Sequence, residues 1–541
     1  MGRDKLLAEL ADRLIVGESP ALSAAGMPGV GKTALAVALA HHRRVLEHFD
    51  GGVLWAGLGP EPDVVGIQAA WAEALERDIS LIADPERRRQ IICNAIGQRR
   101  VLLVIDDAWA LKPVQLLCCS GQVVCLLTTR NDDLARRFAP GQHLRVPELA
   151  EGPSVELLRN LAPEAWEADP DGVRELARST GGLPLALMVL GGYLSQAEHR
   201  VFPQLMQQAL VALSHPDVWL DERAPRAGVV EEFTLAAVIQ LSLDQLARTR
   251  PEAVDAFYAL GAFAPKPARF QYQAAQVVTQ CEAETLALLI GRNLLEKGDD
   301  GLMLHQALAA FALQHCSDEA RQRHRDYYLA QVEENGKDWQ RIERLYPQIL
   351  YAWDWQIQVM PDSRYVVRFA DALQTYQYRR GLRQDQLQWL EAGLAVVEKQ
   401  NESGEIARFL NNIGGVYSAL GEKEKALSYY EQALPLYRQV GDRGGEATTL
   451  NNIGMVYDAL GEKEKALSYC EQAVNLTHQI GDAWSEFVIL GNIGTIYIKE
   501  EQWTKAEDHL QRAVSIGEAI GHPDTELYHR VLVLVKAKSG R

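Results

Sequence analysis

The sequence has no apolar run long enough to cross a membrane and no excess of basic residues. Its longest apolar stretch, residues 183–194, is shorter than the roughly 20 residues that a membrane-spanning helix needs. The net charge is −17, and the short basic pieces at 87–89 and 321–325 are flanked by acidic or apolar residues. Because nucleic-acid binding needs clustered Lys and Arg to neutralise phosphates, the composition argues against membrane insertion and against direct nucleic-acid binding.

Cysteine is also sparse, and its spacing indicates no metal site. The cysteines form no CxxC pair and no His–Cys spacing suited to zinc, and their apolar neighbours predict reduced, mostly buried thiols. Residues 2–10 are amphipathic and charged, unlike a signal peptide, so we expect a cytoplasmic protein. The composition, 47% hydrophobic and 23% charged, is that of about three or four globular domains. The seven cysteines are Cys93, Cys118, Cys119, Cys125, Cys281, Cys316 and Cys470.

Residues 26–33, GMPGVGKT, form a complete GxxxxGK[ST] phosphate-binding loop. The loop follows an apolar stretch at 21–25 and opens an apolar helix at 34–40, which is the strand–loop–helix setting that the motif needs. Its glycines let backbone N–H groups approach phosphate oxygens, Lys32 is predicted to contact the β- and γ-phosphates, and the Thr33 hydroxyl completes a Mg²⁺ site. An ordinary glycine-rich turn is the simpler alternative. The residues predicted to hold ADP or ATP here are Gly26, Gly29, Val30, Gly31, Lys32, Thr33 and Ala34.

Two further predicted strands end in the polar residues that phosphoryl transfer needs. Short apolar strands alternate with helical segments up to about residue 150, which predicts a parallel sheet with its ligand crevice at the strand ends. Asp106 is predicted to hold Mg²⁺ through water, while Asp107, Lys32 and Arg130 are the candidate catalytic residues: Asp107 would polarise water and Arg130 contact the γ-phosphate. Acids that only cap a strand, and a surface Arg, are the simpler alternatives. The strands are predicted at 21–25, 52–58, 101–105 and 123–127.

The strand signal fades between residues 150 and 320. Pro184 is placed to open an apolar helix after Gly181 and Gly182. Residues 284–305 predict a helix followed by a β-hairpin with a Gly/Asp turn, which is typical of a winged helix. Residues 271–280 contain no Lys or Arg, so this winged helix lacks the charge expected of a DNA-binding helix.

The last part of the chain repeats itself at an interval of 40 residues. Residues 411–417 recur at 451–457 and 491–497, and each unit predicts two amphipathic helices that cross at small residues such as Gly414 and Ala426. This is the tetratricopeptide pattern, in a unit longer than the usual length of about 34 residues. A fainter copy precedes these units and carries Gln374 and Gln386 in the small-residue positions.

One polar position recurs in each regular unit: Asn412, Asn452 and Asn492. At this spacing the three amides are predicted to form a ladder along one face of the superhelix. Amides that both donate and accept suit the backbone of an extended peptide, and bonding between neighbouring repeats is the alternative.

Taken in order, these motifs resemble the NB-ARC proteins of the STAND class of signal-transduction ATPases. The resemblance implies that Arg3 touches adenine, that Pro184 packs on the nucleotide and that His305 contacts the β-phosphate of ADP. A helix start for Pro184, and a strand-end or helix-cap role for His305, are the simpler alternatives. Gln306 stands where the family usually has Asp, which weakens the expectation that this element locks the resting state.

We therefore predict a multidomain protein: an α/β P-loop domain, a helical domain, a winged helix, then an all-α tetratricopeptide superhelix. It would act as a switch that rests with ADP, is active with ATP and Mg²⁺, hydrolyses slowly, and self-associates when a protein or peptide binds the repeats. The resemblance implies an effector outside this chain. A constitutive scaffold with structural nucleotide, and a DNA-binding regulator, are the alternatives. The predicted boundaries are 1–150, 151–228, 229–318, a helical linker at 319–364, and 365–541.

Overall fold

The computed structural model describes residues 2–24, 29–60, 62–79, 82, 84–119, 123–195, 230–298, 300–336 and 338–539. Gly26 of the phosphate-binding loop lies outside the described residues. The chain divides into two compact units, residues 1–355 with 379–381 and residues 356–378 with 382–541. The finer division into five domains stays a prediction.

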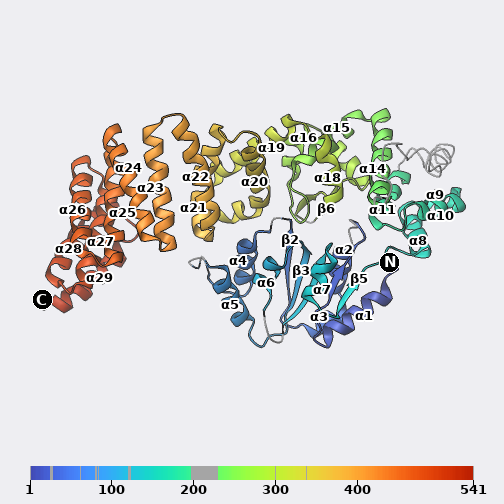
Figure 1. Ribbon diagram of the computed structural model, residues 1–541, viewed down its shortest axis with the longest axis horizontal. Coiled ribbons are helices and arrows are strands. Elements are labelled where there is room, and N and C mark those ends of the chain that lie inside the picture. The colour runs from blue at the N-terminus through green and yellow to red at the C-terminus, as the bar shows by residue number, and fades with distance from the viewer. Residues whose placement is uncertain are drawn as a thin grey trace. The chain divides into compact units, whose positions relative to one another are not determined.

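The first unit begins with a parallel five-stranded sheet in the order β2-β3-β4-β1-β5 (Figure 1). The four predicted strands are confirmed, whereas β5 was missed because it has three residues, none of them buried. The strands are β1 (Ala21–Ser23), β2 (Val53–Gly59), β3 (Leu102–Ala108), β4 (Val124–Thr129) and β5 (His143–Arg145).

Helices cover both faces of this sheet, and successive residues of a strand point alternately to one face and the other. Leu102 and Val104 of β3 pack with the first group of helices, and Leu103 and Ile105 pack with the second. Both faces are therefore apolar, which explains the continuous hydrophobic run of β3. The first group is α1 (Asp4–Ile15), α2 (Lys32–Ala40) and α3 (Arg43–His48); the second is α4 (Val64–Ala74), α5 (Pro85–Ile96), α6 (Leu111–Leu117) and α7 (Asp132–Phe138).

The rest of the first unit is mainly helical, as predicted. Pro184 occupies the first turn of its helix, where its missing N–H costs nothing. The predicted helix and hairpin are present, with Lys297 opposite Leu302 in the antiparallel pair. The elements are α8 (Glu151–Leu161), α9 (Pro163–Ala168), α10 (Pro170–Ser179), α11 (Pro184–Leu194), α14 (Val230–Thr249), α15 (Pro251–Ala259), η2 (Leu260–Ala262), α16 (Tyr272–Thr279), α17 (Ala283–Gly291), β6 (Glu296–Gly298), β7 (Gly301–Met303), α18 (Gln306–His315), α19 (Asp318–Asn335) and α20 (Trp339–Val359), whose last residues belong to the second unit.

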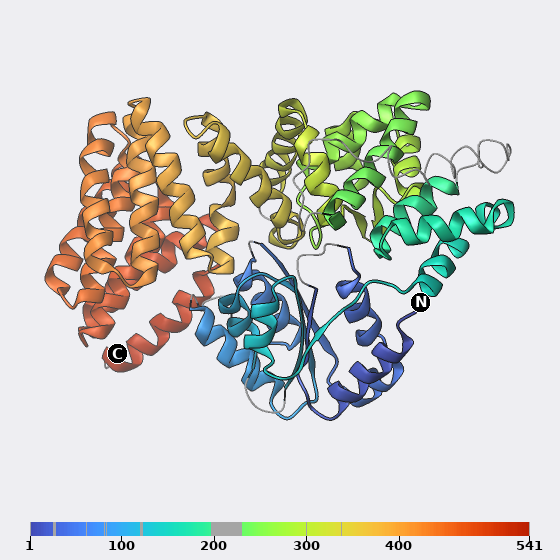
Figure 2. The same cartoon turned by 45° about the vertical axis from the view of Figure 1, so that its right-hand side comes forward.

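The second unit is a stack of helix pairs (Figures 1 and 2), as the repeats predicted. A side chain on Gly414 would lie 2.7 Å from the Tyr430 ring, and one on Gly454, the equivalent position of the next unit, would lie 3.0 Å from the Ala466 carbonyl oxygen, so the helices cross closely at these small residues. Ala426 is fully buried in the same unit. The helices are α21 (Arg364–Arg380), α22 (Arg383–Lys399), α23 (Ser403–Leu420), α24 (Lys423–Val440), α25 (Arg443–Leu460), α26 (Lys463–Ile480), α27 (Ala483–Lys499), α28 (Trp503–Ile520) and α29 (Thr525–Ser539).

The recurring asparagines bond to the preceding repeat. Asn412 Nδ2 donates to Gln374 Oε1 at 3.0 Å, and Asn452 Nδ2 donates to Asn411 Oδ1 at 3.2 Å. Asn492 repeats the pattern with Asn451 at 3.0 Å. These amide donors are engaged between repeats, so the alternative role, holding the stack together, is the one the contacts support.

The cysteine prediction was wrong in two respects. Cys93 and Cys119 form a disulfide, with their Cα atoms 5.4 Å apart. Of the other five cysteines only Cys125 and Cys470 are buried. The 26-residue separation of the bonded pair carries no local signal, because α5 and α6 bring the two residues together.

No helix in the described part of the chain combines the length and the apolar character that a bilayer span requires.

Candidate nucleotide-binding site

The described end of the phosphate-binding loop is shaped by glycine. Gly31 precedes α2 with φ 91°, and a side chain there would lie 3.2 Å from Arg3 Nη1. Gly29 has φ 83°, and a Cβ would approach Leu185 Cβ to 2.8 Å. Both positions therefore need glycine for conformation and for space. The first turn of an α-helix leaves N–H groups without intrahelical partners, so the start of α2 suits an anion.

Lys32 is the first residue of α2 and is 8% exposed. Burial and the nearby Arg130 lower the pKa of Lys32 to about 8, against the opposing effect of Asp107 and Asp106. Among the described residues, its ammonium has no hydrogen bond or ion pair within normal distance. A nearly buried cation without a partner is costly, and an anionic ligand would compensate it.

Asp106 links the start of α2 to two strands. Its carboxylate accepts from Thr33 Oγ1 at 3.0 Å and from Thr128 Oγ1 at 2.5 Å. Burial raises the pKa of Asp106 although these hydroxyl bonds lower it. One carboxylate, one hydroxyl and ligand phosphates are the set that Mg²⁺ prefers, so Thr33 and Asp106 fit a magnesium ion bound with nucleotide.

Asp107 follows Asp106 directly but sits at an irregularity in β3. The register with β4 shifts between Ile105 and Ala108, and Asp107 has a φ of 54°. Asp tolerates this left-handed conformation better than most residues. The irregularity lets two consecutive carboxylates serve the carboxyl edge of the sheet, where regular alternation would send them to opposite faces.

Asp107 lies in a small polar network with the residue after β4. Arg130 Nε is 3.5 Å from Asp107 Oδ1, and Trp109 Nε1 donates to Asp107 Oδ2 at 3.0 Å. The Arg130 guanidinium also stacks near the Trp109 ring, 5.4 Å from its centre. The two predicted catalytic side chains are thus brought together.

Gln306, the first residue of α18, joins this network from the part of the unit predicted as a winged helix. Its Oε1 accepts from Arg130 Nη2, and its Nε2 donates to Asp107 Oδ2 at 2.6 Å and to the Lys266 carbonyl at 3.2 Å. A neutral amide can satisfy a cation and an anion at once. The usual Asp of the family would instead oppose Asp107 with a second negative charge, so the substitution matches this site.

His305 is the residue before α18 and caps it, since its Nδ1 accepts from the Ala307 N–H at 3.2 Å. Burial, with the positive charges of Lys266 and Arg130, lowers the pKa of His305 to about 3. The imidazole is therefore neutral near pH 7. Because Nδ1 accepts, the proton lies on Nε2, which is free to donate to a ligand oxygen.

The other predicted contacts are distributed around the loop. Arg3 Nη2 donates to the carbonyls of Val30 and Pro147, both at 2.7 Å, so the guanidinium braces the loop backbone. Pro184 Cγ lies 3.9 Å from the position of a Cβ on Gly31. The Val30 side chain is fully buried in the core, and Ala34 is exposed on α2.

Three members of the site were missed from the sequence: Gln306 as a bridging residue, Trp109 and Thr128. Thr128 carried a signal, since it directly follows the apolar stretch at 123–127 that predicts a strand. Trp109 and Gln306 carried no signal beyond their place in the motifs. Trp109 stacks under Arg130, 21 positions away, and Gln306 bonds to Arg130 and Asp107, 176 and 199 positions away.

Comparison with known proteins finds two family models that match parts of the chain. A family model for the NB-ARC domain matches residues 3–167, and one for the tetratricopeptide repeat matches residues 405–477.

The curated relatives that match part of the chain include two plant disease resistance proteins. The chain is 30% identical over 214 residues to disease resistance protein RGA2 of Solanum bulbocastanum, covering 36% of this chain and 22% of that protein. It is 30% identical over 202 residues to disease resistance protein At4g27190 of Arabidopsis thaliana, covering 34% and 20% respectively. The matched part thus spans about a fifth of each relative.

A solved structure of a STAND protein with a tetratricopeptide repeat sensor from Pyrococcus horikoshii aligns with 98% of this chain and 92% of its own, at 16% identity and a TM-score of 0.42. The two family models cover the two ends of the architecture that the motifs predicted. Residues 3–167 thus match the NB-ARC domain family, and residues 405–477 match the tetratricopeptide repeat family.

Proposed function

We propose that this chain is a nucleotide-controlled switch that is closed with ADP and opens with ATP and Mg²⁺. The repeat array senses a protein or peptide, the ATP form self-associates and recruits an effector, and slow hydrolysis resets the cycle. The observation that carries the proposal is the Gln306 bridge. It ties the winged-helix part to Arg130 and Asp107, the two groups expected to act on a γ-phosphate.

The Lys32 ammonium supports phosphate binding. A cation that is 8% exposed and unpaired among the described residues gains most from an anion placed at the adjacent helix N-terminus. Because its pKa is lowered only to about 8, Lys32 remains mostly charged near neutral pH and would bind a phosphate oxygen as a cation.

The Thr33–Asp106–Thr128 arrangement supports a metal held with the nucleotide. Thr128 donates to Asp106 Oδ1 and Thr33 Oγ1 donates to Oδ2 at 3.0 Å, so the carboxylate and the Thr33 hydroxyl lie together at the start of α2. Mg²⁺ would neutralise phosphate charge there, and Asp106 would orient its water shell.

In this proposal the Gln306 bridge explains why the closed form would hydrolyse ATP slowly. Arg130 and Asp107 are engaged with each other and with Gln306, so neither is free to act on a γ-phosphate or its attacking water. A γ-phosphate that recruits Arg130 competes with the bridge. ATP then favours the open form through differential contacts, which is the only way a ligand shifts such an equilibrium.

His305 supports ADP as the resting ligand. Its neutral imidazole offers one donor, Nε2–H, while Nδ1 is engaged at the start of α18. A β-phosphate oxygen bound by Lys32 and Nε2–H would connect the loop to α18. Release of that contact would free both His305 and its neighbour Gln306 together.

The repeats supply the partner surface in this proposal, and the cytoplasm is its proposed location. A constitutive scaffold would keep nucleotide without turnover. The DNA-binding alternative gains no support, because α16 (Tyr272–Thr279) contains no basic residue.

The test is the nucleotide content of the purified chain. We expect bound ADP in the wild type and its loss in Lys32→Ala, because removing about two charged hydrogen bonds costs roughly 3–6 kcal/mol. Lys112→Ala is the matched control, since Lys112 is an exposed lysine of the same domain. Wild-type ADP content in Lys32→Ala, measured by chromatography after denaturation, contradicts the proposal.

A further inference from the structure

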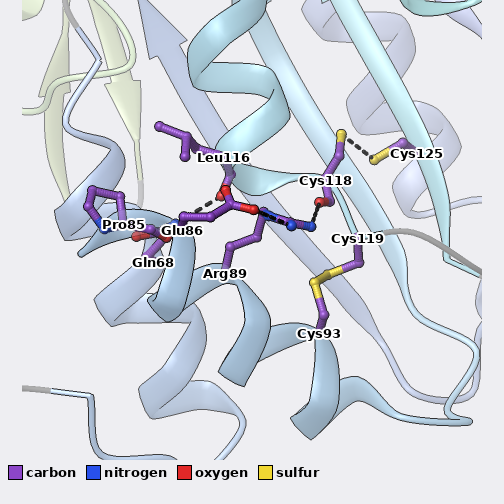
Figure 3. Close-up of a disulfide and its surroundings, with 9 residues drawn as sticks. All are labelled: Gln68, Pro85, Glu86, Arg89, Cys93, Leu116, Cys118, Cys119 and Cys125. Atoms are coloured by element: carbon purple, nitrogen blue, oxygen red, sulfur yellow. Dashed lines mark hydrogen bonds and ion pairs between the residues drawn. A yellow bond between two sulfur atoms is a disulfide. The ribbon is translucent and has the colours of Figure 1, made fainter. Parts of the chain in front are cut away.

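Four cysteines gather on one face of the sheet, between α5, the end of α6 and β4 (Figure 3). Cys93 of α5 is disulfide-bonded to Cys119, which follows α6. The preceding residue, Cys118, places its Sγ 3.4 Å from the Sγ of Cys125 in β4. A disulfide and a dithiol pair therefore lie within one small region.

The two free thiols of this region have different surroundings. Cys118 is half-buried, whereas Cys125 is 5% exposed in the core. The hydrogen bond with Cys125 and the charge of Arg89 lower the pKa of Cys118, and Arg89 Nη1 also donates to the Cys118 carbonyl at 3.2 Å. The hydrogen bond with Cys118, together with burial, raises the pKa of Cys125 well above its usual value.

This difference assigns separate roles in thiol chemistry. An accessible thiol that forms a thiolate readily is the attacking group, and a buried neighbour within reach is the resolving group. The Cys93–Cys119 disulfide tethers the segment after α6 to α5 and so keeps Cys118 beside β4.

We propose that Cys118 and Cys125 form a thiol–disulfide exchange site that accepts low-molecular-weight disulfides. The Cys118 thiolate attacks one sulfur of the incoming disulfide, forming a mixed disulfide and releasing one small thiolate. Cys125 loses its proton and attacks the Cys118 sulfur, forming the Cys118–Cys125 disulfide and releasing the second thiolate. The protein dithiol is oxidised by two electrons, and the small disulfide is reduced to two thiols.

The site is separate from the nucleotide crevice. Cys125 pairs with Leu103 in the sheet, three positions before Asp106, and its side chain belongs to the helix-covered core with Leu103. Exchange here is therefore distinguishable from loss of nucleotide binding.

The experiment treats the full chain with oxidised glutathione and follows intact mass and peptide maps over time. We expect a transient glutathione adduct on Cys118, then loss of two hydrogens and a Cys118–Cys125 pair. Modification at Cys118 should be at least about tenfold faster than at buried Cys470, whose pKa is raised to about 12.

Cys118→Ser should abolish both products. Because Cys118 is half-buried and follows α6, we expect the variant to fold as the wild type does. Cys470→Ser, which removes a buried thiol far along the chain, serves as the control and should react as the wild type does. A stable adduct on wild-type Cys118, equal reaction of Cys118→Ser, or stoichiometric Zn²⁺ uptake by these thiols in place of oxidation would each overturn the proposal.

Discussion

Replacing Gln306 with Glu exchanges the side-chain NH2 group for an oxygen and leaves the size of the side chain almost unchanged. The introduced carboxylate can still accept from Arg130, but it cannot donate to Asp107 Oδ2, which lies 2.6 Å from the wild-type amide nitrogen, or to the Lys266 carbonyl. Two carboxylates would face each other at hydrogen-bond distance. The closed arrangement that we propose for α18 should therefore be weakened.

The magnitude follows from the contacts. A hydrogen bond to a charged group contributes about 1.5–3 kcal/mol, and its loss is aggravated here by repulsion between like charges. The Asp107 side chain is 13% exposed and that of Arg130 26%, so water screens the repulsion only partly. A charged pair between the introduced carboxylate and Arg130 offsets part of this destabilisation. The net cost is on the order of 2 kcal/mol, or roughly thirtyfold in an equilibrium constant.

The assay is the release rate of a fluorescent ADP analogue. We expect Gln306→Glu to release it about thirtyfold faster, and Gln306→Asp, the family's usual residue, to release it faster than wild type as well. Gln273→Glu on exposed α16 adds the same charge away from the site and is the control. Equal release from Gln306→Glu and Gln273→Glu would refute the reasoning, because the bridge would then contribute nothing to closure.

Three further outcomes are expected. Asp107→Asn, which introduces a residue that also tolerates the left-handed backbone, should retain ATP and Mg²⁺ but slow turnover measured by phosphate release. Asp106→Asn should weaken Mg²⁺-dependent binding. Wild-type turnover in both variants would mean that the two acids only cap the strand. His324 is buried, and burial lowers its pKa from 6.5 to about 4. The free energy of unfolding should therefore be constant above pH 6.5 as far as this group is concerned, and should fall as the pH drops from 6.5 toward 4. His324→Gln should flatten that loss, worth on the order of 3 kcal/mol, in melting curves across this window. Asn452→Ala should lower the melting temperature of the array, because the bond to Asn411 that it removes contributes about 1 kcal/mol. An unchanged melting temperature would instead favour the predicted role of this amide in binding an extended peptide.

The fold was largely predictable because its signals are local or periodic. Apolar runs predicted four of the five strands, and repetition at 40 residues predicted the helix pairs that begin at Ser403, Arg443 and Ala483. β5 escaped because three partly exposed residues leave no pattern.

The sequence by itself determined the phosphate-binding loop and the repeat array, since each is specified by residues close together in the chain. Only the tertiary structure decided what Gln306 does, 176 positions from Arg130, and which cysteines pair. It also decided that Asn452 bonds to its neighbouring repeat. Such contacts depend on how separate elements pack, and packing brings together side chains whose separation along the chain has no regular period.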